Sequence, residues 1–316
     1  MKSRKMYRYT IWTAAYNAES TIHRTYKSLE SQSFKDFEWI VVNDGSIDGT
    51  AKVLEDIKEQ ASFPLHVINK ENGGKHTALR EAAKVAYGKY VVIIDSDDEL
   101  LPDALSIFDK YWKELENTPQ YDSFWQIKGQ CIDETGKPMG PKLPKEPYFD
   151  SDYNQIQFKY KNKSEMECAS KYEVMVNEAA VPNHFIFEDK CSNFGEGIRW
   201  SRAARKFKTR FISDVVRIYH RDVVGSLTAS NKKQRSMKHT YNLFVYELYC
   251  IKERRDLMLK YDLKSYFSTL LALSYHSLCT GVSLNSEETK LFTNVTEKIV
   301  CALFKIPLFI VFKIRK

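Results

Sequence analysis

The stretch that decides the fold is Tyr90-Val91-Val92-Ile93-Ile94-Asp95-Ser96-Asp97-Asp98. It opens with five bulky, mostly β-branched residues, which is typical of a buried strand. Four polar residues follow at once, and three of them carry carboxylates. Carboxylates crowded at the end of a buried strand repel one another unless a cation lies nearby. We therefore predict a strand over Tyr90–Ile94 with a functional site at its carboxyl end.

The residues before this stretch repeat the same pattern. Strands are predicted over Tyr9–Ala15, Phe37–Val42 and Leu65–Asn69, separated by helices over Ser20–Ser31, Thr50–Gln60 and about Lys75–Ala86. This alternation indicates βαβ units on a mostly parallel sheet, and such sheets bind ligands outside the carboxyl ends of their strands. Polar groups follow three of the strands: Tyr16-Asn17, Asn43-Asp44 and the Asp95-Asp97-Asp98 group.

The rest of the chain is less regular. We expect residues 119–198 to form a lobe covering the sheet edge, with short strands over Phe124–Gln130 and Lys171–Val176. A helix is predicted over Arg199–Arg205, a strand over Arg210–Ile218, and helices from about residue 232 onward. The fold class is α/β, a mixed and mostly parallel sheet flanked by helices, with a helical C-terminal extension.

The net charge of +7 is unevenly divided along the 316 residues. Residues 1–198 carry 25 Lys/Arg and 32 Asp/Glu, whereas residues 199–316 carry 23 and 9. A basic second half suits nucleic acid, an anionic membrane or a phosphorylated substrate. The high aromatic content excludes a disordered chain. The six cysteines form no C-x-x-C pair, which argues against a cysteine zinc site and favours reduced thiols in a cytoplasmic protein.

The acidic group suggests a metal site. On a strand, Asp95 and Asp97 point to one side and Asp98 to the other. Hard carboxylate oxygens suit Mg²⁺ or Mn²⁺, which bind through one or two carboxylates together with substrate phosphates. The alternative is a solvated acidic turn that caps the helix starting near Pro102.

Four segments in this order resemble the family 2 glycosyltransferases of the GT-A fold. They are Tyr9–Glu19, Phe37–Thr50, Asn72-Gly73-Gly74-Lys75-His76 and Asp95-Ser96-Asp97-Asp98. The resemblance covers residues 9–118 strongly and about 119–222 more loosely. It implies a GT-A sheet and an inverting transferase that uses a nucleotide-diphospho-sugar and a divalent metal, Mn²⁺ or Mg²⁺.

The resemblance also implies roles for single residues. Tyr16 would stack on the nucleotide base, and Asp44 would accept the base N3–H, which suits uracil. Lys75 or His76 would lie near the nucleotide. The predicted donor-binding residues are Tyr16, Asn17, Asp44, Gly74, Lys75, His76, Asp95, Ser96 and Asp97, and the predicted metal ligands are Asp97, Asp98 and His220. For His220, which follows the last predicted strand, a purely structural role is the alternative.

An inverting displacement needs a base that deprotonates the acceptor hydroxyl. In the family this base lies just before a helix that is followed by a strand, and Glu196 in Gly195-Glu196-Gly197-Ile198-Arg199-Trp200 fits that place. Asp189 is the second candidate. The alternative for Glu196 is a carboxylate stabilised by the dipole at a helix start, and for Glu188-Asp189 it is a solvated loop.

We expect a catalytic domain over residues 1–228, with a nucleotide-binding half (1–118) and an acceptor half (119–228), and a basic helical region over 229–316. Residues 299–316 are mostly apolar, with basic residues between the apolar ones. Lys305 and Pro307 divide them into pieces of about seven residues, too short to span a bilayer. This segment suits contact with the cytoplasmic face of the inner membrane, or packing on the core or on another subunit of an oligomer.

The sequence therefore predicts a glycosyltransferase of the hexosyl- or N-acetylhexosaminyltransferase type, cytoplasmic or peripheral on the membrane. It would move a sugar from a nucleotide-diphospho-sugar, most simply a UDP-sugar, to a hydroxyl of a saccharide or lipid-linked acceptor. The pathway would be cell-surface polysaccharide or glycolipid synthesis. No nucleic-acid motif is present. The alternative is a non-catalytic nucleotide-sugar-binding or membrane-binding module with the same fold; the presence of Asp44, Asp97, Asp98 and Glu196 argues for the enzyme.

Overall fold

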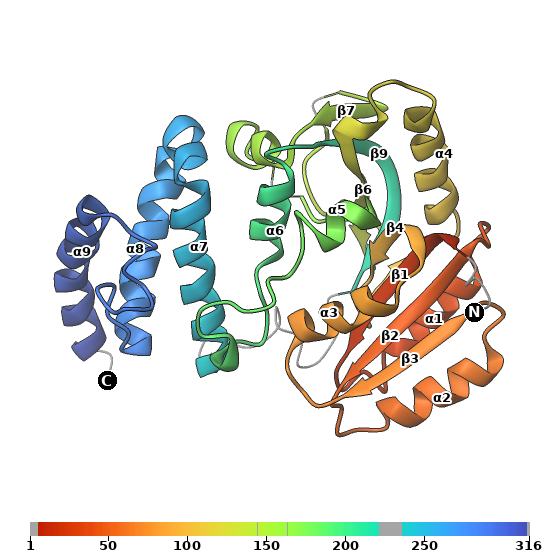
Figure 1. Cartoon of the computed structure of the whole chain (residues 1–316), viewed down its shortest axis with the longest axis horizontal. Coiled ribbons are helices and arrows are strands. Elements are labelled where there is room, and N and C mark those ends of the chain that lie inside the picture. Colours follow the sequence, from red (N-terminus) through yellow and green to blue (C-terminus); the bar gives the residue numbers. More distant parts are fainter. Residues whose placement is uncertain (1–5, 144, 163, 221–235, 315–316) are drawn as a thin grey trace.

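The computed structural model describes residues 6–143, 145–162, 164–220 and 236–314, with side chains up to Lys305. Its strands are β1 (Tyr7–Ala15), β2 (Phe37–Asp44), β3 (Leu65–Lys70), β4 (Gly88–Ile93), β5 (Glu99–Leu100), β6 (Phe124–Asp133), β7 (Tyr148–Ser151), β8 (Met166–Lys171) and β9 (Lys208–Tyr219). In these residues they form one sheet in the order β3-β2-β1-β4-β8-β6-β9-β5, with β7 paired to β9 (Figure 1).

The first four strands are parallel, as the alternating pattern predicts, and they share one carboxyl edge. Beyond β4 the sheet changes direction, because β8 pairs antiparallel with both β4 and β6. Strand β9 then pairs in parallel with β6. The carboxyl end of β4 consequently lies at the same edge of the sheet as the start of β8 and the end of β9, which are remote in the sequence.

Helices cover both faces of the sheet. They are α1 (Ile22–Glu30), α2 (Thr50–Gln60), α3 (Lys75–Val85), α4 (Ala104–Glu116), α5 (Tyr172–Val176), α6 (Glu196–Ala203), α7 (Met237–Tyr261), α8 (Leu263–Thr280) and α9 (Val295–Ile314), with short turns at Tyr121–Ser123, Gln155–Lys159 and Glu188–Lys190. On β2, Trp39 and Val41 pack into the core beneath α1, α2 and α4. Ile40 and Val42 pack into the opposite core, which continues through α3 and α6 to α7. Because both faces are covered, every residue of β2 is buried.

Two predictions for the middle of the chain are wrong. The strand predicted over Lys171–Val176 is a helix from Tyr172, and the strand ends at Lys171. A segment of five residues fits a strand period as well as a helix period, so the pattern does not distinguish them. In the described part of residues 119–198, β6 and β8 lie in the interior of the sheet, so this region is not confined to a lobe over its edge. This placement depends on long-range antiparallel pairing, which local periodicity does not report.

The last three helices stack at the end of the molecule away from the parallel strands (Figure 1). Helix α9 is continuous from Val295 to Ile314, so Lys305 and Pro307, which interrupt the apolar run in the sequence, do not end the helix. A proline inside a helix removes one backbone hydrogen bond, and the helix can absorb this as a kink. None of the helices in the described residues is long and apolar enough to cross a membrane. The predicted domain boundary at 228/229 lies outside the described residues.

Candidate active site

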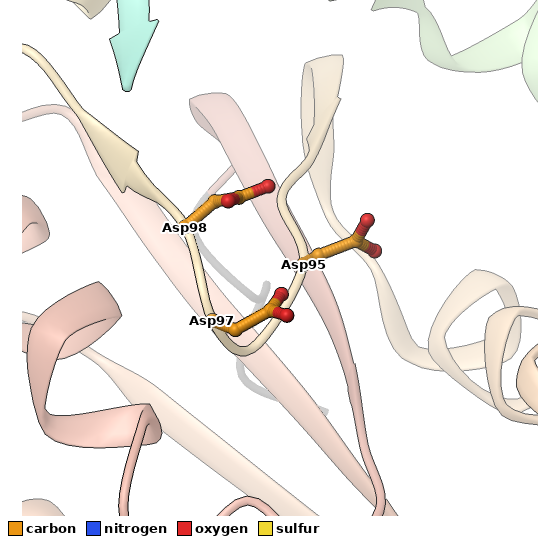
Figure 2. A group of neighbouring side chains, drawn as sticks. All are labelled: Asp95, Asp97 and Asp98. Carbon is orange, nitrogen blue, oxygen red and sulfur yellow. The ribbon is translucent and has the colours of Figure 1, made fainter. Parts of the chain in front are cut away.

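Asp95, Asp97 and Asp98 lie on the turn that follows β4 (Figure 2). The strand ends at Ile93, and the N–H of Asp98 donates to the carbonyl of Asp95 (3.3 Å). The expected strand-like alternation of these side chains is therefore wrong: all three leave the turn in the same general direction. One oxygen from each carboxylate lies within 4.8 Å of the others. The hydroxyl of Thr25 on α1 fixes the turn by donating to the carbonyl of Asp98 (2.9 Å).

Arg217 of β9 partly neutralises this turn. Its guanidinium pairs with Asp98, lies 3.8 Å from Asp95 and donates to Glu167 of β8 at 3.1 Å. Asp98 and Glu167 are almost completely buried. Burial raises the pKa of Asp98 against the effect of Arg217, and it raises the pKa of Glu167 to about 7. The Arg217 charge is shared among several carboxylates and cannot neutralise them all.

Asp97 has no described ion pair. Burial, together with the neighbouring charges of Asp98 and Asp95, raises the pKa of Asp97 to about 6. Three converging hard oxygen donors with surplus negative charge fit Mn²⁺ or Mg²⁺. His220 also lies near the acidic turn. Its backbone N–H donates to Asp98 (2.9 Å), whereas its ring forms a hydrogen bond with Glu99 (2.7 Å). Its role as a metal ligand stays a prediction that these contacts do not support.

Lys75 joins the acidic turn to the start of α6. Its Nζ lies 2.6 Å from Asp95 and 3.3 Å from Glu196, the first residue of α6. Burial alone would lower the pKa of Lys75, but the two carboxylates outweigh burial and raise it. In turn, the charge of Lys75 lowers the pKa of Glu196. Glu196 is thus kept ionised beside the proposed metal site.

A cavity of about 40 Å³ lies between these groups. Its lining includes Lys75, Asp95, Glu196 and Arg217, and also Trp200 of α6 and Glu165, which precedes β8. Lys128 of β6 packs with its Nζ 3.5 Å from the centre of the Trp200 ring. Aromatic, carboxylate and ammonium groups thus meet around one small space. We name this space the catalytic cavity.

Asp44 lies at the end of β2 and is buried. It accepts hydrogen bonds from Lys70 Nζ (2.6 Å) and from the N–H groups of Gly73 (3.0 Å) and Gly74 (2.7 Å). Gly74 has a φ of +91°, and a Cβ there would overlap the carbonyl of Ser192, so this close turn requires glycine. Because these hydrogen bonds already engage the Asp44 carboxylate within its own loop, its hydrogen bond to a uracil base stays a prediction.

The structure distinguishes Lys75 from its neighbour His76. His76 is fully buried, packs on Phe185 and lies 3.4 Å from Glu188, away from the acidic turn. Adjacent residues on a helix point about 100° apart, so only Lys75 faces the carboxylates. Burial and the charge of Arg80 lower the pKa of His76.

The remaining predicted residues have separate places. Tyr16 is half exposed and available for stacking. Asn17 connects the β1 and β2 loops, since its N–H donates to Ser46 and its side-chain oxygen accepts from Ile47, both at 3.0 Å. Ser96 lies partly buried on the acidic turn. Asp189 is exposed, and none of the described contacts joins it to Lys75 or Asp95.

Sequence reasoning did not identify Arg217, Glu167, Glu165, Lys128, Arg199 or Trp200 as site residues. Glu167 and Arg217 lie in strands, where buried charges are rare unless they are paired. This signal was available, but it does not say which two strands meet.

A family model described as glycosyl transferase family 2 matches residues 10–169, just over half of the chain. The chain belongs to this family. The poly-beta-1,6-N-acetyl-D-glucosamine synthase of Staphylococcus epidermidis is 37% identical over 91 residues, which are 29% of this chain and 22% of that protein. The chondroitin synthase of Pasteurella multocida is 36% identical over 99 residues, 31% of this chain and 10% of that protein. The matched segment thus spans less than a quarter of either relative.

Solved structures show the same fold for this family 2 chain. S. aureus TarS 1-349 in complex with UDP-GlcNAc matches with a TM-score of 0.58 at 16% identity, over 94% of this chain and 79% of that one. The mannosyltransferase PcManGT from Pyrobaculum calidifontis in complex with GDP-Man and Mn²⁺ matches with a TM-score of 0.53 at 15% identity, over 96% and 88%. At these identities the likeness concerns the fold alone.

Proposed function

We propose that this protein is a metal-dependent, inverting glycosyltransferase. It would move a sugar, as a hexosyl or N-acetylhexosaminyl group, from a UDP-sugar to a hydroxyl of a saccharide or lipid-linked acceptor. The observation that carries the proposal is the Lys75 bridge, which brings Asp95 of the nucleotide-binding half together with Glu196 of the acceptor half. Family membership supports transfer, and the names of the polysaccharide synthases among its relatives support a role in cell-surface polysaccharide or glycolipid synthesis.

Glu196 is the proposed base. With its pKa lowered by Lys75, it is ionised at neutral pH and can take the proton of the acceptor hydroxyl. As this proton moves to the carboxylate, the acceptor oxygen bonds to the anomeric carbon of the donor. The bond from that carbon to the diphosphate breaks, and its electron pair leaves with the diphosphate. Lys75 holds Glu196 and Asp95 in position throughout.

Asp97, with Asp95 and Asp98, would hold Mn²⁺ or Mg²⁺. When bound, the ion neutralises the charge that develops on the leaving diphosphate. Asp97 is the side chain best able to provide a ligand, because no described ion pair engages it. Asp98 is partly committed to Arg217 and to the N–H of His220.

The decisive experiment is a thermal-unfolding screen of UDP-, GDP- and CDP-sugars, each with and without Mn²⁺. We expect a UDP-sugar to raise Tm only with the metal; a ligand at 100 times its Kd contributes about 2.7 kcal/mol. A preference for GDP-sugars would contradict the uracil assignment of Asp44 but leave the transferase proposal intact. Donor binding with neither hydrolysis nor transfer to any acceptor would instead favour the non-catalytic module.

We also propose that the C-terminal helices contact the inner membrane, where a lipid-linked acceptor would lie. Helix α8 exposes Leu263, Phe267, Leu271 and Tyr275 at four-residue intervals, and α9 exposes Val295, Ile299 and Leu303 in the same way. Cys301, on the other side of α9, is buried and bonds the Leu270 carbonyl on α8, so deleting the whole segment would also disturb packing.

Surface substitutions therefore test this membrane contact. The double variant Ile299→Glu/Leu303→Glu should lower co-sedimentation with vesicles that contain anionic lipid by at least about tenfold, because buried apolar area contributes to interfacial binding. Tyr160→Glu, on a partly exposed aromatic outside the helical region, is the matched control. Unchanged vesicle binding by the double variant would refute the contact.

A further inference from the structure

A second cavity, of about 300 Å³, is lined by residues of α3, of α5 and of the loop that follows α5; Figure 1 shows where these two helices lie. Its apolar lining comes mainly from Trp12, Leu79, Tyr172, Met175, Val176 and Val181. Its size is at the lower end of ligand pockets, which start at about 300 Å³. We name this space the α3–α5 cavity. It shares Met175 and Arg199 with the catalytic cavity.

The described charged residues that line the α3–α5 cavity are all basic. Arg80, Lys84 and Arg199 line it, and no Asp or Glu does in the described part of the chain. Arg80 pairs with Glu188 and Lys84 with Glu81 outside the cavity, so these two charges are largely compensated. Arg199 is the exception, because none of the described ion pairs compensates its charge. It therefore determines that the cavity favours an anionic ligand.

Arg199 is 2% exposed, and its described hydrogen-bond partners are neutral. Its Nε donates to the carbonyl of Ala179 (2.7 Å) and its Nη2 to the sulfur of Met175 (3.2 Å), whereas none of the described bonds uses Nη1. Glu196 lies one turn earlier on α6; none of the described ion pairs joins it to Arg199, but its charge partly offsets the effect of burial on the pKa of Arg199. A buried guanidinium without a paired anion is costly, and an anion beside it would remove that cost.

Two further buried donors lie in the lining. The indole Nε1 of Trp12 and the Nε of Arg80 have no hydrogen-bond acceptor among the described residues. Trp12 is 2% exposed and meets Tyr172 edge to face, with ring centres 6.3 Å apart. These two donor atoms are shielded by the wall itself, so the cavity presents an aromatic, apolar wall in which Arg199 is the buried cation.

We propose that the α3–α5 cavity binds an amphipathic phosphate monoester, with its phosphate paired to Arg199 and its apolar part against Trp12 and Tyr172. The Arg199 cation, in a lining without carboxylates among the described residues, suits the charge of about −1.5 to −2 that a phosphate monoester carries at neutral pH. A guanidinium also matches phosphate oxygens geometrically. The site is distinct from the proposed donor site and does not depend on the proposed transfer reaction.

Calorimetric titration of the full chain with octyl phosphate tests the proposal. Octanol and inorganic phosphate, in separate titrations, distinguish an amphipathic ligand from an apolar chain or a free phosphate. We expect octyl phosphate to bind, and each of the other two to bind at least tenfold more weakly. Octanol binding equally well, or inorganic phosphate binding equally well, would overturn the proposal, as would the absence of octyl phosphate binding.

Variants locate the ligand. Arg199→Met removes the charge, and Ala180→Phe fills the cavity from its loop, so each should weaken octyl phosphate binding at least tenfold. Ala180→Phe gives an answer even if Arg199→Met does not fold. Arg205→Met is the matched control, because Arg205 pairs with Asp256 on the surface and lines neither cavity. Asp97→Asn should also bind as wild type; lost binding there would place the ligand in the donor site and refute the assignment, as would undiminished binding by Ala180→Phe.

Discussion

The catalytic cavity and the α3–α5 cavity share the wall formed by Met175 and Arg199, yet they differ in charge. The first is lined by four carboxylates, Asp95, Glu165, Glu167 and Glu196, and by three cations, Lys75, Arg199 and Arg217. The second has three cations and, in the described residues, no carboxylate. The difference shows that charge is divided between the two cavities: carboxylates line the first and, in the described residues, only cations line the second.

Helix α3 contributes to both cavities. Its first residue, Lys75, reaches the acidic turn, whereas Arg80 and Lys84 line the α3–α5 cavity. Residues five and nine positions along a helix lie on a different side from the first. One short helix can therefore place cations in two sites, and variants should affect the two sites separately.

The largest expected effect concerns Glu196. Glu196→Gln should lower kcat for transfer by about 100- to 10,000-fold, because a general base contributes about that factor. Donor binding, measured by calorimetry, should stay within a few-fold of wild type, and so should octyl phosphate binding. Asp189→Asn is the matched control and should keep its activity. Activity lost in Asp189→Asn and kept in Glu196→Gln would reverse the assignment of the base.

Asp97 comes next. Asp97→Asn should lower metal-stimulated hydrolysis and transfer by about 100- to 1,000-fold, since a catalytic metal supplies several kcal/mol. Direct titration with Mn²⁺ should show the lost affinity without a donor present. The thermal stability of the metal-free protein should not fall, because replacing Asp97 relieves repulsion with Asp95 and Asp98. Full activity in both Asp97→Asn and Asp98→Ala would mean that the metal site is misplaced.

Asp98 lies on the same turn, and a stability measurement tests its structural role there. Asp98→Asn weakens the ion pair with Arg217 and should lower the free energy of unfolding by about 2–3 kcal/mol, the range for a buried charged hydrogen bond. Urea denaturation measures this. The control is Asp122→Asn, whose carboxylate is 96% exposed beside Lys171, and it should change stability by less than about 0.5 kcal/mol. Equal effects in the two variants would contradict the buried pairing.

The smallest effect concerns His76, which lies on α3 and lines neither cavity. The folded protein disfavours its protonation, since burial and Arg80 lower its pKa, whereas the unfolded chain takes up the proton below about pH 6.5. The free energy of unfolding should therefore fall as the pH drops below 6.5, by at most about 1.4 kcal/mol per pH unit from this group. Denaturation between pH 7 and 5 should show a shallower fall for His76→Gln than for wild type or for the exposed control His184→Gln. Identical slopes in all three proteins would contradict this origin.

The sequence alone determined the parallel half of the sheet. The helix over Thr50–Gln60 is confirmed at both ends, and the strands predicted over Tyr9–Ala15 and Phe37–Val42 differ from the structure by two residues at one end. These elements follow from local periodicity, because each strand is covered on both faces and each helix on one. The acidic turn was also evident from sequence, since three carboxylates follow an apolar strand directly.

Only the tertiary structure decided how the site is assembled. Lys75 and Glu196 are 121 positions apart, and Arg217 meets Asp98 because β5, which starts directly after Asp98, pairs antiparallel with β9. Local patterns specify strands and helices, whereas the pairing of distant strands depends on the packing of the whole core. The same reason explains why the basic α3–α5 cavity could not be found from sequence: its lining comes from β1, α3, α5 and α6, and only folding brings these elements together.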